Sequence, residues 1–201
     1  MRLGLLGGSF DPIHYAHLLL AERAREQLAL EQVWLIPAAT APHKRDRRQT
    51  PVEQRIAMAD LAAVDNPGLV VSRLEADRDG PSYTADTLRR LTERQADAEL
   101  FFLVGADMLA DLPSWYEPEV VCRMATIAAV RRPGNGEPDY SGLGQIATAE
   151  RIEHFRRHQV DMPAIDISST DIRRRVAEGR SIRYMTSPAV AEYIRAYGLY
   201  R

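Results

Sequence analysis

The sequence has little cysteine: Cys122 is the single one in 201 residues, so no disulfide can form within the chain. One cysteine also rules out a cysteine cluster of the kind that holds zinc. No apolar run approaches the roughly 20 residues that a membrane-spanning helix needs. The first residues run straight into Gly7-Gly8, without a hydrophobic stretch long enough for a signal peptide. We therefore expect a cytoplasmic protein without a membrane partner.

An excess of one charge is also missing, because 26 Lys and Arg face 28 Asp and Glu, for a formal net charge of −2. A net charge this small gives no reason to expect nucleic acid as a partner. The hydrophobic fraction of 45% and the charged fraction of 27% are typical of a globular protein. A chain of this length suits one core, and we expect a single domain over residues 1–201.

Short apolar runs alternate with helical segments along the whole chain. Strands are predicted at 3–6, 33–36, 69–71, 100–104, 125–130 and 164–167, and helices at 14–28, 50–64, 84–95, from 169 or 170, and 187–198. This alternation predicts a parallel sheet with helices on both faces, the Rossmann-like doubly wound α/β architecture. Ligands in such sheets bind beyond the carboxyl ends of the strands, where the strand order reverses. Residues that follow the strands are therefore the candidates for function.

Local signals mark where several of these segments begin and end. Thr50-Pro51-Val52-Glu53 has the pattern of a capping box with proline at the first helical position. Ser187-Pro188 predicts the start of the last helix, which ends at Gly198. Residues 133–144 begin with Pro-Gly-Asn-Gly and predict a flexible stretch.

The segment Gly7 to His17 joins the first predicted strand to the first predicted helix. Its two glycines let the backbone approach a phosphate and adopt conformations closed to other residues. The helix start offers N–H groups and a positive dipole end. His14 and His17 are three residues apart, so both rings leave one face of the first turn and can donate hydrogen bonds to phosphate oxygens. We expect Asp11 and Pro12 to cap and stiffen this turn.

Each of these features has a simpler interpretation. A Gly-Gly pair after a strand is often only a turn, and two histidines at this spacing can hold a metal or lie on the surface. No third ligand sits nearby at metal-ligand spacing. The combination of strand, glycines, histidines and helix start favours a phosphate site.

A second strand-to-helix junction is predicted at Ile167-Ser168-Ser169-Thr170-Asp171-Ile172-Arg173. Ser169 or Thr170 is expected to cap the helix and leave N–H groups for a ligand. Arg173 lies one turn into the helix, where its guanidinium can bind phosphate oxygens in a bidentate manner. The alternative is a capped helix with solvated arginines, which we prefer for Arg174 and Arg175.

These two junctions resemble the motifs of one enzyme superfamily. GGSFDPIHYAHL is similar to the GxFxPxHxxH signature of the nucleotidylyltransferase superfamily, which joins the α-phosphate of a nucleotide to a phosphorylated acceptor and releases pyrophosphate. Residues 167–173 resemble its ISSTxIR motif, whose arginine binds the leaving phosphates. The resemblance implies that His14, His17 and Arg173 are catalytic, and that Mg²⁺ is bound together with ATP.

Three further regions resemble the bacterial nicotinate-mononucleotide adenylyltransferases: Ala41–Lys44, Pro81–Leu88, and Val104 to Trp115. The resemblance covers most of the chain and implies ATP and nicotinate mononucleotide as substrates. In that family the tryptophan, here Trp115, stacks on the pyridine ring. Backbone N–H groups of Tyr83 and Thr84 suit the ring carboxylate, Lys44 a phosphate, Asp107 a ribose, and Arg132 the nucleotide. Without the resemblance, each of these residues is better explained by packing, capping or solvation.

The expected site is therefore a set of two overlapping groups of residues. The candidate ATP-binding residues are Gly7, Gly8, Ser9, Phe10, His14, His17, Gly105, Asp107, Arg132, Ser168, Ser169 and Arg173. The candidate nicotinate-nucleotide-binding residues are Ser9, Lys44, Tyr83, Thr84, Asp107 and Trp115. No protein metal site is expected, and whether the chain forms a homo-oligomer is left open.

Two departures from the family pattern and three alternative functions remain. Ala16 stands where relatives commonly have glycine, and residues 184–188 differ from the usual apolar-then-proline form. The acceptor is alternatively nicotinamide mononucleotide, or pantetheine phosphate, whose enzymes tend to be shorter and lack the Tyr83-Thr84 and Trp115 signals. A non-catalytic nucleotide-binding module is the third alternative, against which the intact His14, His17 and Arg173 argue.

Overall fold

The computed structural model describes residues 1–39, 49–78, 80–134 and 136–201. Its centre is a sheet in which every pair of neighbouring strands is parallel. The strands are β1 (Arg2–Gly8), β2 (Gln32–Pro37), β3 (Leu69–Val71), β4 (Glu99–Val104), β5 (Thr126–Arg131) and β6 (Val160–Asp161). Their order is β3-β2-β1-β4-β5-β6. The predicted doubly wound parallel sheet is therefore confirmed.

The strands are apolar throughout because both faces of the sheet are covered. Along β4, Leu100, Phe102 and Val104 join one buried cluster. Phe101 and Leu103, which alternate with them, join the cluster on the opposite face. Successive side chains of a strand point to opposite faces, so a strand buried on both sides must be hydrophobic at every position.

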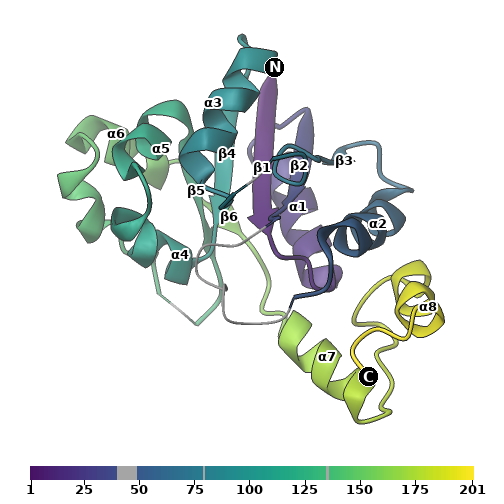
Figure 1. Ribbon diagram of the computed structural model, residues 1–201. Helices are drawn as coiled ribbons and strands as arrows, with labels where there is room; N and C mark the ends of the chain where they lie inside the picture. The colour runs from purple at the N-terminus through teal and green to yellow at the C-terminus, as the bar shows by residue number, and fades with distance from the viewer. Residues whose placement is uncertain (40–48, 79, 135) are drawn as a thin grey trace.

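Helices cover each face of this sheet (Figure 1). α1 (Tyr15–Gln27), α2 (Val52–Ala63) and α8 (Pro188–Ala196) pack on one face. α3 (Thr84–Arg94) and α5 (Pro118–Met124) pack on the other, where α6 (Ala149–Arg156) adds Phe155. α4 (Ala106–Asp111) follows β4, and α7 (Ser169–Ala177) lies near α8, beyond the carboxyl end of β1.

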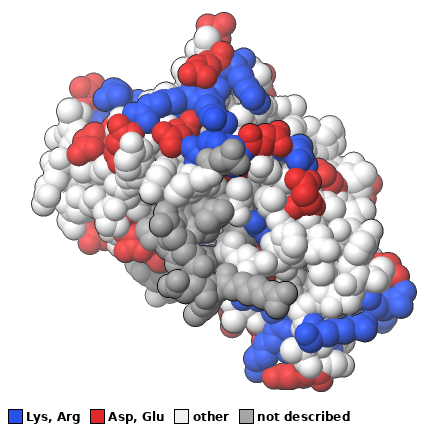
Figure 2. All heavy atoms as spheres, viewed as in Figure 1, with Lys and Arg blue, Asp and Glu red and all other residues white. Residues whose placement is uncertain are grey.

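Figure 2 shows charges of both signs mixed over the face seen in Figure 1. Basic side chains gather over the end of the molecule that α7 and α8 form. Across the described ranges, no helix combines the length and the apolar character that crossing a membrane requires.

The strand order reverses between β1 and β4, which lie side by side at the middle of the sheet. From β1 the chain proceeds to β2 and β3, and then returns to β4 on the other side of β1. Loops that leave β1 and β4 therefore diverge and open a crevice at the carboxyl edge of the sheet. Gly7-Gly8 and Gly105 stand at this edge, as expected.

Two expectations about local structure are wrong. Pro51, not Thr50, occupies the N-cap position of α2, and no side chain caps this helix. Thr50 lies outside the helix because its N–H donates to Asp11 and its carbonyl accepts from Arg55. The last strand is β6, which pairs with Val130 and Arg131, and residues 164–167 form no strand. Pro163 follows this pairing and has no N–H to extend the ladder.

The stretch predicted to be flexible, 133–144, is in part packed. It leads into the 3₁₀ helix η3 (Ser141–Gln145), and both Tyr140 and Leu143 are buried. The sequence patterns also missed α4, the 3₁₀ helix η2 (Leu112–Ser114), α5 and α6. These elements are short, so few residues are available to show a helical period.

Candidate active site

The first loop begins later than its glycines predict. β1 continues through Gly7 and Gly8, which pair with Ile36 and Pro37 of β2. Neither glycine has a positive φ, so the expected special backbone conformation is wrong for both. The left-handed residue is Phe10, with φ of 47° and a fully buried ring. The absence of a side chain still matters at Gly8, because a Cβ there would stand 3.1 Å from the Phe10 ring.

His14 and His17 lie together at the start of α1, as predicted. His14 is the N-cap residue, and its ring stacks on that of His17 with 3.7 Å between the centroids. The backbone N–H of His14 donates to Nδ1 of His17 at 3.3 Å. A neutral His17 ring therefore has its proton on Nε2 and can donate a hydrogen bond only from that atom.

The His14 ring is almost fully buried, with 5% of the residue exposed. Burial penalises the charged imidazolium and lowers the pKa of His14 to about 4. His14 is therefore neutral near pH 7. Its Nδ1 is itself buried and has no hydrogen-bond partner among the described residues.

The two predicted helix junctions meet in space, although some 150 residues separate them in the chain. Three successive carbonyls of the first loop each accept a hydrogen bond from a side chain near the C-terminus. Arg173 Nη1 donates to Asp11 at 2.7 Å, Ser169 Oγ to Pro12 at 2.9 Å, and Thr186 Oγ1 to Ile13 at 2.8 Å. The loop carbonyls are thus turned towards the C-terminal helices.

The cap of α7 differs from the prediction by one residue. Ser168 is the N-cap, and its Oγ accepts from the N–H of Asp171 at 3.1 Å. Ser169, one of the two predicted caps, instead uses its hydroxyl on Pro12. Thr170, the other, accepts from Arg173 Nη2 at 3.3 Å. The contact with the first loop therefore decides which serine caps the helix.

Asp11 does not cap α1, because His14 takes that position. Its carboxylate is buried and joins two distant parts of the chain. Oδ1 accepts from the Tyr200 hydroxyl at 2.6 Å, and Oδ2 from the N–H of Thr50 at 3.3 Å. Burial and the neighbouring carboxylate raise the pKa of Tyr200, so this phenol remains a hydrogen-bond donor.

Arg55 is a buried arginine behind the first loop that the sequence patterns missed. Only 1% of it is exposed, and within the described part of the chain its guanidinium donates to backbone carbonyls alone. Ser9 accepts at 2.6 Å and Ala38 at 2.7 Å, so Arg55 joins the ends of β1 and β2. Its signal in the sequence is its place beside Ile56 on the apolar face of α2, where a charge requires buried partners.

A cavity of about 740 Å³ opens beside the first loop. Its lining includes seven of the predicted site residues: Gly7, Gly8, Ser9, Tyr83, Thr84, Asp107 and Trp115. The sequence patterns missed Ala38, Glu75, Ser82, Phe102, Met108, Asp111, Ser114 and Tyr116, which complete it. Residues from four separate strand ends therefore converge on one space.

Aromatic rings form much of one wall of this cavity. Trp115 packs edge-on against Phe102, with the ring centroids 6.0 Å apart. Tyr83 packs against Tyr116 at 4.5 Å. A flat aromatic ligand suits such a wall, because ring faces and edges attract one another.

The N-terminus of α3 borders the same cavity. Tyr83 is its N-cap residue, and no side chain caps the helix. The Tyr83 N–H donates to the Pro81 carbonyl at 3.1 Å. Of the two backbone donors that the sequence suggested, the turn therefore engages Tyr83 internally, and the N–H of Thr84 has no backbone partner among the described residues.

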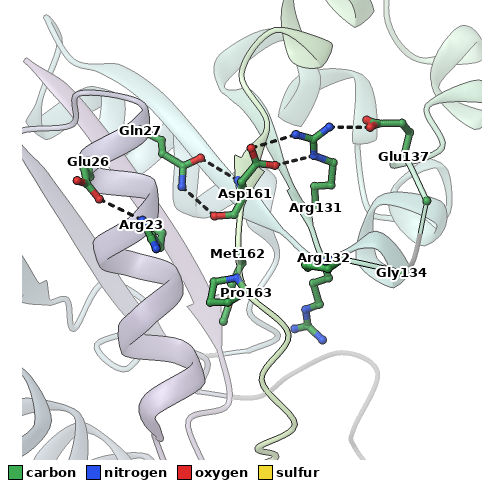
Figure 3. Close-up of a pocket in the computed structure, with 12 residues that line it drawn as sticks. Arg23, Glu26, Gln27, Arg131, Arg132, Gly134, Glu137, Asp161, Met162 and Pro163 are labelled. Atoms are coloured by element: carbon green, nitrogen blue, oxygen red, sulfur yellow. Dashed lines mark hydrogen bonds and ion pairs between the residues drawn. The ribbon is translucent and has the colours of Figure 1, made fainter.

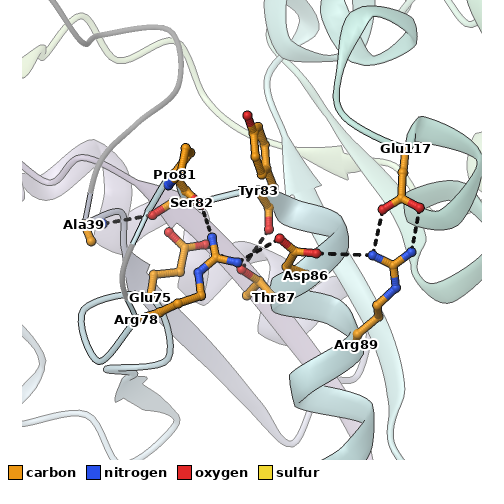
Figure 4. A network of polar contacts seen from close by, with 10 residues as sticks. All are labelled: Ala39, Glu75, Arg78, Pro81, Ser82, Tyr83, Asp86, Thr87, Arg89 and Glu117. Atoms are coloured by element: carbon orange, nitrogen blue, oxygen red, sulfur yellow. Dashed lines mark hydrogen bonds and ion pairs between the residues drawn. The ribbon is translucent and has the colours of Figure 1, made fainter.

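A network of polar side chains supports this helix start from behind (Figure 4). Glu75 is buried, and its Oε1 accepts from Thr87 Oγ1 at 2.8 Å. Desolvation raises the pKa of Glu75. Two ion pairs lie further along the same helix: Arg78 with Asp86 and Arg89 with Glu117.

Several predicted residues lie outside the 740 Å³ cavity. Gly105 is the N-cap of α4, and a Cβ there would stand 2.6 Å from the Asp107 carboxylate. Phe10, His14, His17, Ser168, Ser169 and Arg173 surround the first loop next to it. Lys44 lies outside the described residues.

Arg132 borders a separate cavity of about 900 Å³ between α1 and the chain after β5. Its side chain points away from the neighbouring Arg131–Asp161 ion pair (Figure 3). Arg131 is held by Asp161 at 2.6 Å and Glu137 at 2.7 Å. The structure therefore does not bring Arg132 into the cavity that Trp115 lines.

Comparison with known proteins agrees with this geometry. The model of the cytidylyltransferase-like family matches residues 5–175. A probable nicotinate-nucleotide adenylyltransferase of Thermomicrobium roseum is 46% identical over 200 residues, which cover 100% of this chain and 92% of the relative. One of Thermus thermophilus is 46% identical over 201 residues and 100% of both chains.

The fold also matches a solved structure. The Plasmodium falciparum nicotinic acid mononucleotide adenylyltransferase complexed with NaAD aligns with a TM-score of 0.78 and 22% identity, over 99% of this chain and 97% of that one. Sequence relatives at this level of identity and coverage establish the family. The chain therefore belongs to the cytidylyltransferase-like family and, within it, to the nicotinate-nucleotide adenylyltransferases.

Proposed function

We propose that this chain transfers the adenylyl group of ATP to nicotinate mononucleotide, forming nicotinate adenine dinucleotide and pyrophosphate. The observation that supports this most is the convergence of two helix N-termini, those of α1 and α7, around His14, His17 and Arg173. An aromatic-walled cavity of about 740 Å³ adjoins them. A polyphosphate site next to a site for a flat ring is what this reaction requires.

The proposed chemistry needs no protein nucleophile. The 5′-phosphate of the acceptor is already ionised and attacks the α-phosphorus of ATP in line with the leaving pyrophosphate. The oxygen of the acceptor forms the new P–O bond while the bond to the β-phosphate oxygen breaks. Catalysis then consists of positioning the two phosphates and stabilising their charge.

Each residue of the phosphate site has a role in this proposal. His17 donates from Nε2, since its Nδ1 accepts from the backbone. His14 acts as a neutral imidazole, because burial disfavours its charged form. Arg173 uses one N–H on Asp11 and has further donors for the leaving phosphates.

On the acceptor side, the proposal places the pyridine ring against Trp115 and its carboxylate at the N–H of Thr84. Both residues line the same cavity. Asp107 accepts from ribose hydroxyls, and Ser9 borders both substrates. Lys44, which lies outside the described residues, is assigned to the acceptor phosphate on the family resemblance alone.

The described residues hold no group of three or more His, Cys, Asp or Glu side chains that could bind a metal ion. Mg²⁺ fits this setting when the phosphates of ATP and water supply its ligands, since this ion retains water readily. Bound in this way, the metal would neutralise charge on the ATP phosphates. We further propose that residues 1–201 act as one nucleotidyltransferase domain in the cytoplasm, without nucleic acid or membrane partners.

A pyrophosphate-release assay tests the proposal. The protein is mixed with ATP, Mg²⁺ and one acceptor at a time: nicotinate mononucleotide, nicotinamide mononucleotide or 4′-phosphopantetheine. We expect the highest kcat/KM with nicotinate mononucleotide. A higher value with either of the other acceptors would contradict the assigned substrate, and no release with any acceptor would indicate a binding module.

A further inference from the structure

Glu75 is a buried carboxyl group for which adenylyl transfer has no use. It lies in the chain between β3 and α3, with only 8% of its surface exposed. It nevertheless lines the cavity that is proposed to take the pyridine ring. A buried acidic group is costly unless its hydrogen bonds are satisfied, so its partners indicate what it does.

The partners of Glu75 stand on both sides of the helix start. Thr87 Oγ1 lies 2.8 Å from its Oε1. Ser82 also hydrogen-bonds the carboxyl, and Ser82 Oγ accepts from the N–H of Ala39 at 3.1 Å. Figure 4 shows the Glu75 carboxyl close to Ser82. The carboxyl therefore holds both ends of the Tyr83–Thr84 segment, and through Ser82 links it to the end of β2.

The hydroxyl of Thr87 indicates which form of Glu75 fits this site. It has one proton and two acceptors within reach, Glu75 Oε1 at 2.8 Å and the Tyr83 carbonyl at 3.2 Å. If Glu75 is protonated, its own O–H donates to Thr87 and the Thr87 O–H donates to Tyr83. Both hydroxyl contacts are then satisfied, whereas an ionised Glu75 takes the single Thr87 hydroxyl proton and the Tyr83 carbonyl keeps the Thr87 N–H as its donor. Burial of the carboxyl raises its pKa, which is a shift towards the protonated form.

The surrounding arginines form no ion pair with Glu75 within the described residues, and the charges of Arg78 and Arg55 lower its pKa by less than burial raises it. Arg78 pairs with Asp86 at 2.8 Å, and Arg89 pairs with Glu117 at 2.7 Å. Arg55 donates to backbone carbonyls. Within the described part of the chain, no ion pair involves Glu75. An ionised form would also repel the carboxylate of a nicotinate ring in the same cavity.

We propose that Glu75 is a positioning residue that, through Ser82 and Thr87, holds the Tyr83–Thr84 backbone against the pyridine carboxylate of the acceptor. This inference rests on the proposed function. Glu75 acts from behind the turn and does not touch the reacting phosphates. Its loss should therefore weaken binding of the acceptor and leave binding of ATP nearly unchanged.

The test compares KM for nicotinate mononucleotide with KM for ATP in four variants. Glu75→Gln keeps the shape and the donor and acceptor of a neutral carboxyl, so KM for nicotinate mononucleotide should stay within about threefold of the wild type. Glu75→Ala leaves Ser82 and Thr87 without their partner and should raise KM for the acceptor about tenfold. Thr87→Val should act in the same direction. KM for ATP should change by less than about twofold in all of them.

Thr92→Val is the matched control. Thr92 lies on the same helix, and its hydroxyl donates within the helix to Leu88 at 3.0 Å. In Thr92→Val, KM for nicotinate mononucleotide and KM for ATP should both equal those of the wild type. If thermal unfolding shows that Glu75→Ala does not fold, Thr87→Val decides the question.

Three results would overturn the inference. One is an unchanged acceptor KM in Glu75→Ala and Thr87→Val, and another is an equal rise in both substrates' KM. The third is a loss in Glu75→Gln as large as in Glu75→Ala, which would refute support by the neutral form. A wild type that releases no pyrophosphate with nicotinate mononucleotide would refute the proposed function itself, and is recognised before any variant is made.

Discussion

At the scale of single residues, the two histidines of the first loop are stacked but chemically different. His17 has Nδ1 occupied by a backbone N–H, so its donor is fixed at Nε2. His14 is held neutral by burial and has one nitrogen without a partner among the described residues. A single backbone hydrogen bond thus gives His17 a defined direction towards a phosphate.

Replacing His17 by alanine should therefore remove a phosphate donor and leave the fold intact. Loss of one such transition-state donor typically costs about 2.7–4 kcal/mol, or roughly 10²- to 10³-fold in kcat. The measurement is kcat with saturating ATP and nicotinate mononucleotide, with circular dichroism as the control for folding. Turnover close to that of the wild type in a folded variant would refute the role of His17.

The buried His14 should make the protein less stable in acid. Its pKa is about 4 in the folded protein against an ordinary value of 6.5, so between these values the unfolded chain binds more protons. The contribution of His14 to the free energy of unfolding is therefore at its full value above pH 6.5 and is lost as the pH falls towards 4. Urea unfolding at pH 7 and pH 4.5 should show about 2 kcal/mol less pH dependence in His14→Asn than in the wild type. Equal pH dependence in both proteins would contradict a buried, neutral His14.

At the scale of elements, α7 has a structural role and a role at the phosphate site, and Arg173 takes part in both. Through Ser169 and Arg173 it holds the carbonyls of Pro12 and Asp11, and it also presents Arg173 to the phosphate site. Lysine at position 173 would keep the positive charge. It would lose the planar guanidinium, which can donate to the Asp11 carbonyl and to a phosphate at the same time.

Arg173→Lys should therefore lower kcat/KM for ATP by about 10²-fold. Arg174→Lys is the control on the same helix, since Arg174 is exposed and pairs only with Asp171 and Glu178 among the described residues. Steady-state kinetics at varied ATP would decide. An unchanged kcat/KM for ATP in Arg173→Lys would show that the positive charge at position 173, and not the planar guanidinium, is what matters.

The order of elements was predictable from the sequence, whereas several local details were not. Buried parallel strands are apolar at every position, so β1 to β5 were found from their runs of hydrophobic residues. The cap of α7 and the start of α2 were predicted wrongly because contacts with the first loop determine them. Arg55 was missed because Ser9 and Ala38, two of its partners, come from other segments of the chain. Glu75 was missed because its partner Thr87 lies across a turn, at a spacing that neither a helical nor a strand period records.

At the scale of the whole molecule, residues near the C-terminus hold the first loop by hydrogen bonds. Tyr200 donates to Asp11, and Thr186 donates to Ile13, although both pairs are far apart in sequence. Asp11 and Thr186 are buried, so these bonds are shielded from water. Folding of α7 and α8 onto the sheet and ordering of the phosphate loop should therefore occur as one cooperative event.

Tyr200→Phe tests this coupling, because it removes one hydroxyl and keeps the ring. The buried Asp11 carboxylate then loses a partner, which should cost about 2 kcal/mol in the free energy of unfolding. If the tail orders the loop, KM for ATP should rise as well. Tyr197→Phe is the matched control, since Tyr197 follows α8 and is 62% exposed. Lower stability of Tyr200→Phe in urea with KM for ATP unchanged would mean that the tail stabilises the fold without shaping the phosphate loop.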